Sequence, residues 1–345
     1  MVEALCKELE LRKDYLQSPD IQTIYYGGGT PSLLNEAELE LIFNTIQKHF
    51  SVATDVEITL EANPDDLSKI RLQTLKDAPV NRLSIGVQSF FEADLRFMNR
   101  AHNATEAVDC IQLAQDFGFE NLSIDLIYGT PTMSNDQWAA NIQQLLDWKI
   151  PHLSCYCLTV EPGTALDHFV KKGTASPVDE VKAAEQFNYL MATLHDAGYE
   201  HYEVSNFSKP SQYARHNTNY WRGVPYLGIG PSAHSFDGPS RQWNIANNAK
   251  YLKAIGEGQP FFEKEILSPA NQFNEYVMTA LRTQWGVNIV KIKAEWGTEI
   301  SRNFEEGIAD VVGRGEAIQR DGHYILTRQG RLLADGIAGG LFIGV

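Results

Sequence analysis

Cysteine, long apolar runs and basic charge are all scarce in this sequence. Four cysteines in 345 residues cannot form a disulfide framework, so we expect a protein of a reducing, cytoplasmic compartment. No apolar run approaches the roughly 18 residues of a membrane-spanning helix, and no secretory signal is visible. These absences argue against a secreted disulfide-rich protein and against an integral membrane protein.

The charge balance argues against a further class of protein. The sequence has 44 acidic residues against 29 Lys and Arg, a net charge of −15, and an isoelectric point near 5.0. A chain of this charge repels nucleic acid and anionic lipid. We therefore expect no nucleic-acid partner and no transmembrane segment, while peripheral contact with a membrane stays open.

Short β-rich runs alternate with longer helical patterns over the first 205 residues. The strand-like runs lie at 23–26, 56–61, 82–87, 122–128 and 152–159, and the helical patterns at 35–49, 65–76, 104–118, 135–149 and 178–197. Strands separated by helices predict right-handed βαβ units around a parallel sheet. Most runs end in polar or glycine-bearing residues, and in a parallel barrel those ends meet on the face that holds the functional site.

The two ends of the chain depart from this pattern. Residues 1–16 form an amphipathic helical pattern where a barrel would have its first strand, which leaves the 23–26 strand with an unpaired edge. Residues 206–262, rich in Asn, Gly, Pro and aromatics, are interpreted as a linking segment. Residues 263–345 resemble a small winged-helix-like domain that contains a hairpin at Asp321-Gly322. We thus expect a partial barrel over residues 1–205, a linker and a C-terminal domain.

Three consecutive glycines, Gly27 to Gly29, follow the first strand-like run and precede Thr30 and Pro31. Glycine allows positive φ and lets backbone amides approach a ligand closely. The spacing matches neither the phosphate-binding loop nor the dinucleotide fingerprint. The segment is therefore either a tight turn or a binding loop for another ligand.

Six motifs in order resemble one known family. The segments are GGGTPSLL, EANP, SIGVQSF, the arginine of MNRAH, SIDLIYGTP and HNTNYW. They are similar to the radical S-adenosylmethionine (SAM) proteins of the oxygen-independent coproporphyrinogen III oxidase group, and within it to the haem-chaperone subgroup HemW. The resemblance covers nearly the whole chain. It implies an α/β fold with a partial (β/α)6 TIM-like barrel, here without its first strand, and a C-terminal HemN-type domain.

The resemblance also implies a SAM site at the strand ends. The glycines and the threonine would lie against the methionine part of SAM, and the side chains would hold its ribose, ammonium and carboxylate groups. For each carboxylate, the alternative is a cap on the following helix. The implied cofactor-binding residues are Gly28, Gly29, Thr30, Glu61, Gln88, Arg100 and Asp125.

Members of the family carry Cys-x-x-x-Cys-x-x-Cys, which holds a 4Fe–4S cluster. Cys6, Cys110, Cys155 and Cys157 do not reproduce that spacing, so we assign no metal ligand. Cys155 and Cys157 are expected to be small buried residues of the barrel wall. Either the protein lacks the cluster, or the chain starts at an internal methionine. The helical start favours the second explanation, and we expect an in-frame strand and the three cysteines upstream.

The HNTNYW segment resembles the haem-binding signature of the HemW subgroup. By that resemblance His216 would ligate haem iron through a neutral imidazole nitrogen, and Asn217, Tyr220 and Trp221 would complete the haem site. His234 is a second candidate ligand. The alternative is a structural His-Asn pair with aromatics buried between domains.

Three functions follow as hypotheses. The first is a haem chaperone that binds haem and SAM and transfers haem to a recipient haem protein. The second is an oxygen-independent coproporphyrinogen III oxidase of porphyrin biosynthesis, which decarboxylates propionates by a radical route and needs the iron–sulfur cluster. The third is a degenerate barrel that serves only as an interaction scaffold. No residue is assigned a catalytic role, and whether the chain is an enzyme is left open.

Overall fold

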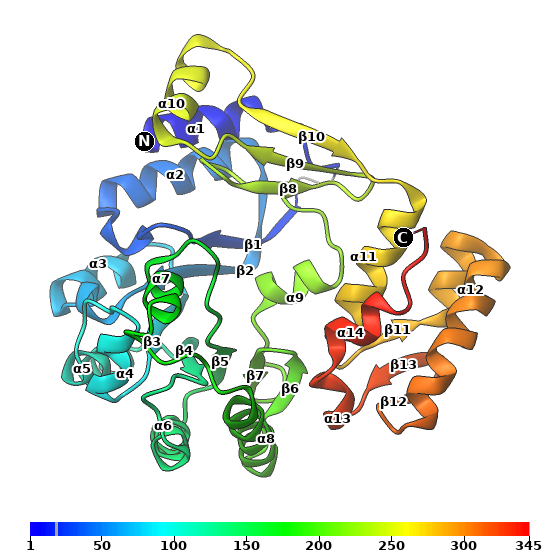
Figure 1. Cartoon of the computed structure of the whole chain (residues 1–345). Coiled ribbons are helices and arrows are strands. Elements are labelled where there is room, and N and C mark those ends of the chain that lie inside the picture. The colour runs from blue at the N-terminus through cyan, green and yellow to red at the C-terminus, as the bar shows by residue number, and fades with distance from the viewer. Residues whose placement is uncertain (18–19, 345) are drawn as a thin grey trace. The chain divides into compact units, whose positions relative to one another are not determined.

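The computed structural model describes residues 1–17 and 20–344, and it confirms the expected α/β fold (Figure 1). Within these residues the largest sheet has seven strands in the order β1-β2-β3-β4-β5-β7-β6. The strands are β1 (Asp20–Tyr26), β2 (Ser51–Ala62), β3 (Arg82–Gln88), β4 (Leu122–Tyr128), β5 (His152–Cys157), β6 (Glu200–Glu203) and β7 (Asn206–Ser208).

The pairing of the central strands is parallel, as the sequence pattern predicts. Strands β2, β3, β4 and β5 pair in parallel in chain order, while β7 runs antiparallel to both β5 and β6. All five strand-like runs of the sequence form strands. The β6–β7 hairpin was not predicted, because strands of three and four residues are too short to show a period of two.

The helices that follow the strands begin where side chains can satisfy the first free amides. Helices α2, α5 and α6 each begin with a capping box. The side chain of the asparagine or serine before the helix accepts a hydrogen bond from the backbone amide of the third helical residue, and the side chain of that third residue accepts one from the backbone amide of the capping residue. The helices of this part are α2 (Glu36–His49), α3 (Lys69–Asp77), α4 (Glu92–Phe97), α5 (Ala104–Asp116), α6 (Asn135–Asp147), α7 (Ala165–Lys171) and α8 (Glu180–Asp196).

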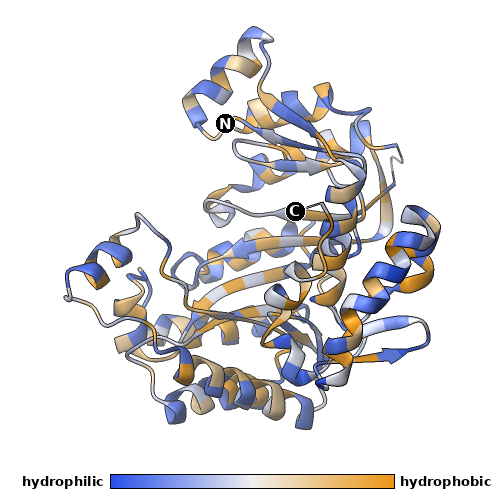
Figure 2. Ribbon diagram, turned by 45° about the vertical axis from the view of Figure 1, so that its right-hand side comes forward, coloured by the Kyte–Doolittle hydropathy of each residue, from blue (hydrophilic) through white to orange (hydrophobic). Residues whose placement is uncertain are grey.

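In the barrel part of the chain, helices α3, α5, α6 and α8 each bury one apolar face. Each long helix carries hydrophobic residues on one side and polar residues on the other, which Figure 2 shows as mixed colours along the ribbons. Trp138 of α6 is fully buried, and its indole N–H donates to the carbonyl of Gln186 on α8 at 2.9 Å. The opposite face of the central strands β2, β3 and β4 carries mostly polar residues.

The chain divides into two compact units. One comprises residues 25–34 and 58–214, which include most of the large sheet and helices α3 to α8. The other comprises residues 1–24, 35–57 and 215–345. We refer to them as the barrel unit and the terminal unit.

The terminal unit contains a second sheet of three antiparallel strands in the order β10-β9-β8. Helix α1 (Val2–Leu11) is tied to this part by Glu8, whose buried carboxylate accepts hydrogen bonds from residues 230, 244 and 251. The elements here are α9 (Arg215–Trp221), β8 (His234–Phe236), β9 (Ser240–Asn244), α10 (Asn248–Glu257) and β10 (Phe262–Ile266). Residues 206–262 thus contain strands and helices of their own.

The last part of the terminal unit has the helix–helix–hairpin order of a winged helix. Strands β12 (Ala317–Arg320) and β13 (His323–Leu326) pair around Asp321 and Gly322, both at positive φ, as the Asp-Gly dipeptide predicts. The other elements are α11 (Pro269–Leu281), β11 (Val287–Asn288), α12 (Ile289–Gly313), which is interrupted at Gly297, α13 (Arg328–Arg331) and α14 (Ala334–Gly339).

Candidate functional site

The polar face of the barrel unit follows from alternation along its strands. On β3, Leu83, Ile85 and Val87 are fully buried. The intervening Ser84, Gly86 and Gln88 are half-buried on the other face. Glu61 pairs with Ser84 across the β2–β3 ladder, and Ser84 contacts Asp125 of β4 at 3.5 Å. The strands therefore place Glu61, Gln88 and Asp125 of the predicted cofactor residues on one face.

The glycine loop after β1 is joined to Glu61. The carboxylate of Glu61 accepts the amide of Gly28 at 3.0 Å and the phenol of Tyr25 at 2.6 Å. Gly28 and Gly29 have φ of 72° and 64°, and apart from their chain neighbours no described residue has an atom within 4 Å of where their Cβ atoms would be. Both adopt the left-handed conformation that glycine favours, and open space lies beside them. Thr30 is exposed at the end of the same loop.

Gln88 and Arg100 converge over Gly86. A Cβ at Gly86 would lie 2.9 Å from Nε2 of Gln88 and 3.4 Å from Nη2 of Arg100. Arg100 Nη2 donates to Asn63 at 2.6 Å and to the Gly86 carbonyl at 3.2 Å. Among the described residues, the buried Nε of Arg100 has no hydrogen-bond acceptor. A charged donor with capacity to spare suits a carboxylate such as that of SAM.

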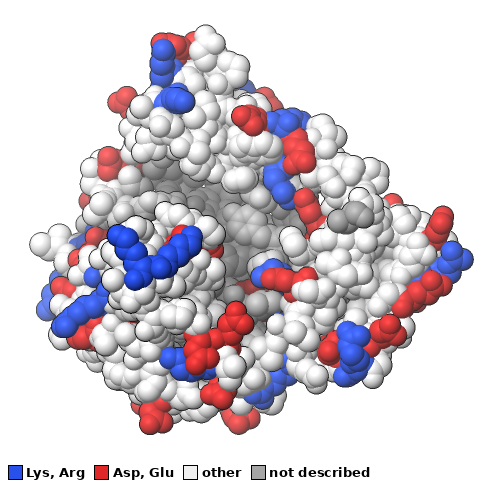
Figure 3. All heavy atoms as spheres, viewed as in Figure 1, with Lys and Arg blue, Asp and Glu red and all other residues white. Residues whose placement is uncertain are grey.

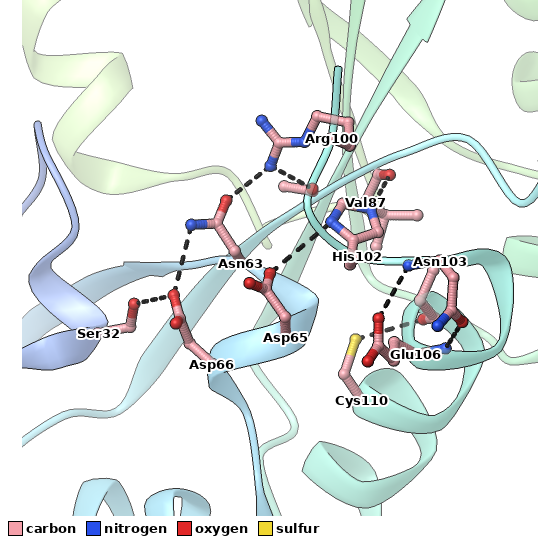
Figure 4. A network of polar contacts seen from close by, with 12 residues as sticks. Ser32, Asn63, Asp65, Asp66, Val87, Arg100, His102, Asn103, Glu106 and Cys110 are labelled. Atoms are coloured by element: carbon pink, nitrogen blue, oxygen red, sulfur yellow. Dashed lines mark hydrogen bonds and ion pairs between the residues drawn. The ribbon is translucent and has the colours of Figure 1, made fainter. Parts of the chain in front are cut away.

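A polar network fixes the loops on which these residues lie (Figure 4). Asp66 accepts from Ser32 of the glycine loop at 2.6 Å and from Asn63 at 3.4 Å, and Asn63 in turn accepts from Arg100. His102 bonds the Val87 carbonyl at 3.0 Å through Nε2. The loops after β1, β2 and β3 are thereby held together.

Asp125 carries the most perturbed carboxyl of the predicted set. Burial raises its pKa, a hydrogen bond from Ser154 lowers it, and the nearby charge of Glu61 raises it, so that its pKa is about 7. An aspartate that titrates near neutral pH on a polar face is typical of a binding site.

Two further residues of this site were not singled out from the sequence. Asn63 lies within the EANP motif and joins Arg100 to Asp66. Its position directly after a strand could have identified it as a candidate site residue from the sequence. Tyr25 donates to Glu61 from the neighbouring strand. No sequence signal reveals that contact, because it depends on which strands are adjacent.

The cysteines do not assemble a metal site. Cys6 is in α1 and Cys110 is buried in α5, while Cys155 and Cys157 lie on β5. No group of three or more His, Cys, Asp or Glu side chains within residues 1–17 and 20–344 could hold a metal ion. The donor set described does not fit a 4Fe–4S cluster. The expectation of burial is correct for Cys155 and wrong for Cys157, which is exposed because β5 ends there.

The predicted haem motif forms helix α9 of the terminal unit. Glu57, at 5% exposure, accepts the amides of Arg215 and His216 at 3.1 and 3.0 Å. The imidazole of His216 bonds Thr23 Oγ1 through Nδ1 and the Tyr220 hydroxyl through Nε2, both at 2.9 Å. Burial lowers the pKa of His216 to about 4, so the ring is neutral at physiological pH.

The remaining motif residues have different surroundings. The guanidinium of Arg282 lies over the ring of Trp221 at 5.7 Å, and that of Arg222 over Trp285 at 4.3 Å. Trp221 thus packs on the C-terminal part of the same unit. Asn217 is half-buried, and His234 is exposed on β8, 6.4 Å from the ring of Trp243. The structure brings His216 and Tyr220 together.

The face drawn in Figure 3 carries both acidic and basic side chains, in small groups separated by uncharged residues. In the part of the chain that the structure describes, no helix is both long and apolar enough to cross a membrane.

Comparisons with known proteins identify relatives of the chain. Residues 6–145 match the model of the Radical SAM superfamily, and residues 267–333 match the HemN C-terminal domain. The Heme chaperone HemW of Bacillus subtilis is 33% identical over 94% of this chain and 86% of that protein. The Heme chaperone HemW of Mycobacterium tuberculosis H37Rv is 33% identical over 97% of this chain and 84% of that protein.

A solved structure shares the fold. The radical SAM enzyme coproporphyrinogen III oxidase (HemN) from Escherichia coli superposes with a TM-score of 0.83 at 22% identity, covering 99% of this chain and 82% of that one. At this identity the likeness concerns the fold alone. The relatives from Bacillus subtilis and Mycobacterium tuberculosis, by contrast, are 33% identical to this chain over the aligned residues. The chain therefore belongs to the HemW heme chaperone family of the radical SAM superfamily.

Proposed function

We propose that this protein binds haem and SAM and transfers haem to a recipient haem protein. Its family membership supports the proposal, and so does the division of the candidate residues between two units. In this proposal residues 1–205 provide the barrel, residues 206–262 carry the haem motif, and residues 263–345 form the HemN-type domain, whose last residue lies outside the described ones. The same proposal includes a cytoplasmic location and peripheral contact of the protein with a membrane.

The observation that carries haem binding is the His216–Tyr220 pair on α9. The two rings are perpendicular, with centroids 4.8 Å apart, and Tyr220 is 42% exposed. Imidazole nitrogen and phenol oxygen are both axial ligands of haem iron in proteins. Asn217 and Trp221 would complete this surface. The pair thus offers an iron ligand on a helix whose start is held by a buried carboxylate.

Titration of the purified chain with ferric haem should produce a defined Soret band that saturates at one haem per chain. In the double variant His216→Ala/Tyr220→Phe both candidate ligands are absent, so the band should revert toward that of free haem. Affinity should fall by about tenfold or more, because a coordinate bond is lost. Absorption spectroscopy measures both effects.

His195→Ala is the matched control, since this histidine of α8 is 86% exposed. It should bind haem like the original protein. A double variant with the original spectrum would exclude α9 and move the search to His234. Absence of defined haem binding by the original chain would contradict the proposed function itself.

SAM is proposed to bind at the polar face of the barrel unit. Gly28, Gly29 and Thr30 would face its methionine part, and Glu61 and Gln88 its polar groups. Arg100 would pair with the carboxylate, and Asp125 would accept from the ribose hydroxyls. The closeness of Gln88 and Arg100 at Gly86, together with the unpaired Nε of Arg100, supports this assignment among the described residues.

Bound SAM would supply a sulfonium centre. Cleavage of a sulfonium bond in this superfamily uses a 4Fe–4S cluster, and the described cysteines do not fit one. We therefore derive no radical step, and the residues named here bind and orient the cofactor.

SAM binding should strengthen as pH rises from about 5.5 to about 7.5. Below its pKa of about 7, Asp125 is protonated and neutral, and it ionises above that value. The ionised carboxylate makes charge-assisted hydrogen bonds to the ribose and attracts the cationic ligand. Asp125→Asn removes this charge and should weaken binding about tenfold to a hundredfold at pH 7.5, with a flattened pH profile. Isothermal titration calorimetry tests both effects.

Asp136→Asn provides the control, because Asp136 is exposed in the first turn of α6. It should keep the affinity and the pH profile of the original protein. If Asp125→Asn kept the rise with pH, the titrating group would be another residue. If it bound SAM as tightly as the original protein, Asp125 would not contact the cofactor.

A further inference from the structure

Four buried polar side chains of the barrel unit lie beside Asp125 and have no role in the proposed function. We refer to Ser123, His152, Ser154 and Tyr202 as the buried polar row. Each of them is at most 3% exposed. Parallel strands that are buried on both faces ordinarily carry aliphatic residues there, and buried hydroxyl or imidazole groups cost free energy unless they are hydrogen-bonded. We therefore expect the row to serve a function rather than packing.

The buried polar row is a continuous series of hydrogen bonds that ends at Asp125. The β4–β5 register pairs Ser123 with His152 and Asp125 with Ser154. The Tyr202 hydroxyl lies 2.7 Å from Nε2 of His152, and Nδ1 of the same ring lies 2.7 Å from the hydroxyl of Ser123. The hydroxyls of Ser123 and Ser154 are 3.2 Å apart, and Ser154 hydrogen-bonds Asp125. The series thus joins β6 to the proposed SAM site.

The ionised carboxylate of Asp125 fixes the direction of every bond in the row. A carboxylate only accepts, so the single hydroxyl proton of Ser154 is donated to Asp125. Ser154 then accepts from Ser123, and Ser123 in turn accepts from Nδ1–H of His152. Burial holds the pKa of His152 well below its usual value, so the ring is neutral. Its Nε2 lone pair accepts the Tyr202 hydroxyl, and all four groups donate toward Asp125.

The other groups around Asp125 do not replace this row. The titratable and charged groups that face Asp125 are Tyr25 of β1, Glu61 of β2, Arg82 of β3, and Cys155 and Tyr156 of β5. Burial raises the pKa of the two phenols and of the thiol, so these three groups are neutral near neutral pH. Glu61 raises the pKa of Asp125, whereas Arg82 lowers it. Among the groups that favour the ionised carboxyl, the hydroxyl of Ser154 has the largest effect.

We propose that the buried polar row positions Asp125 to accept the ribose hydroxyls of SAM. This inference rests on the proposed function, in which Asp125 contacts SAM. A buried carboxylate binds such a ligand well only if it is held ionised and in one orientation, and a row of donors aimed at it does both. The four side chains act through Asp125 rather than on SAM itself. They are positioning residues.

The first test is the pH dependence of SAM affinity, measured by isothermal titration calorimetry. Ser154→Ala should raise the pH midpoint of binding by about one pH unit and weaken binding about tenfold at neutral pH, because a hydrogen bond to the ionised carboxylate is lost. Ser123→Ala and Tyr202→Phe should raise the midpoint by smaller amounts, since they act through one and three intervening groups. Affinity should recover at higher pH, which a distorted site would not show.

Tyr199→Phe is the matched control. Tyr199 is 4% exposed and donates its hydroxyl to the Ile150 carbonyl at 2.5 Å. The substitution removes a buried phenol hydrogen bond, as Tyr202→Phe does, but one that lies outside the row. It should leave the pH midpoint unchanged, whatever its effect on stability. Equal shifts in the Tyr199→Phe and Tyr202→Phe variants would overturn the inference.

A second measurement follows Asp125 without SAM. Carbon-13 NMR of the chain labelled at its aspartate carboxyl carbons records the titration of Asp125, whose signal is identified by its loss in Asp125→Asn. The midpoint of that titration should rise in Ser154→Ala and in Tyr202→Phe. Unchanged midpoints in both variants would overturn the inference. Circular dichroism melting curves identify any variant that is unfolded, and Ser123→Ala, which removes a single oxygen, then supplies the measurement.

The outcomes separate this inference from the proposed function. If the original protein did not bind SAM, the proposed site would fail and this inference with it. If Asp125→Asn flattened the pH profile of SAM binding but Ser154→Ala left it unchanged, the proposed site would stand and only this inference would fail.

Discussion

Replacing Glu8 by alanine should lower the free energy of unfolding by about 3–5 kcal/mol. The Glu8 side chain is fully buried and accepts from the Gly230 amide at 2.8 Å, the Asn244 amide group at 2.7 Å and the Tyr251 hydroxyl at 2.6 Å. It also faces Arg12 at 3.7 Å, and Arg12 is only 7% exposed. Alanine would leave a buried guanidinium without its counter-charge and three buried donors without their acceptor. Urea denaturation followed by circular dichroism measures the loss.

Glu10→Ala is the control on the same helix. Glu10 is half-exposed and pairs with Lys7 across one turn, and such an exposed ion pair contributes little to stability. The loss of unfolding free energy in Glu8→Gln should lie between those of Glu8→Ala and Glu10→Ala. The glutamine amide keeps one acceptor oxygen, but its N–H groups face the donors that the carboxylate satisfied. Equal midpoints for the Glu8→Ala and Glu10→Ala variants would show that α1 is not anchored through this carboxylate.

Replacing Asp94 by alanine should destabilise the protein by about 3 kcal/mol, and it should also weaken SAM binding. Asp94 is fully buried in α4 and accepts from Ser89 at 2.8 Å, from Thr132 at 2.5 Å and from Thr130 at 3.4 Å. These hydroxyls belong to the loops after β3 and β4. Without the carboxylate they lose a shared acceptor, and Gln88, which holds φ at 68° beside Ser89, loses its support.

The measurements are the urea midpoint and the SAM affinity of the same variant. Asp116→Ala, at the exposed end of α5, should change neither by more than a small amount. A variant of Asp94 that is destabilised but binds SAM normally would show that the buried network does not support the cofactor site. A variant of unchanged stability would contradict the importance of these hydrogen bonds.

The candidate cofactor residues lie in the barrel unit, and the candidate haem residues lie in the terminal unit. Substitutions at Asp125 and at Tyr220 therefore test two ligands separately. A loss of haem binding with unchanged SAM affinity, or the reverse, would assign each ligand to its own unit.

Much of the fold could be predicted from local pattern. The β-rich runs became strands because alternating or continuous apolar residues have to be buried on a sheet, and the helices begin at Asn35, Asn103 and Ser134, which cap them. The Asp321-Gly322 turn followed from the positive φ that this dipeptide accepts. Short strands such as β6 and β7 stayed hidden, because their partners, rather than their own periodicity, make them strands.

The sequence by itself determined the α/β class, the motif order and the family, since these depend on residues near one another in the chain. Only the tertiary structure decided which side chains meet. The contacts of Glu8 with Tyr251, of Tyr25 with Glu61, and of Thr23 with His216 join residues that are 243, 36 and 193 positions apart. Such contacts arise from how strands and helices pack, and no local pattern encodes them. Packing likewise left Tyr220 exposed and His216 doubly hydrogen-bonded beneath it, a difference that the motif HNTNYW does not contain.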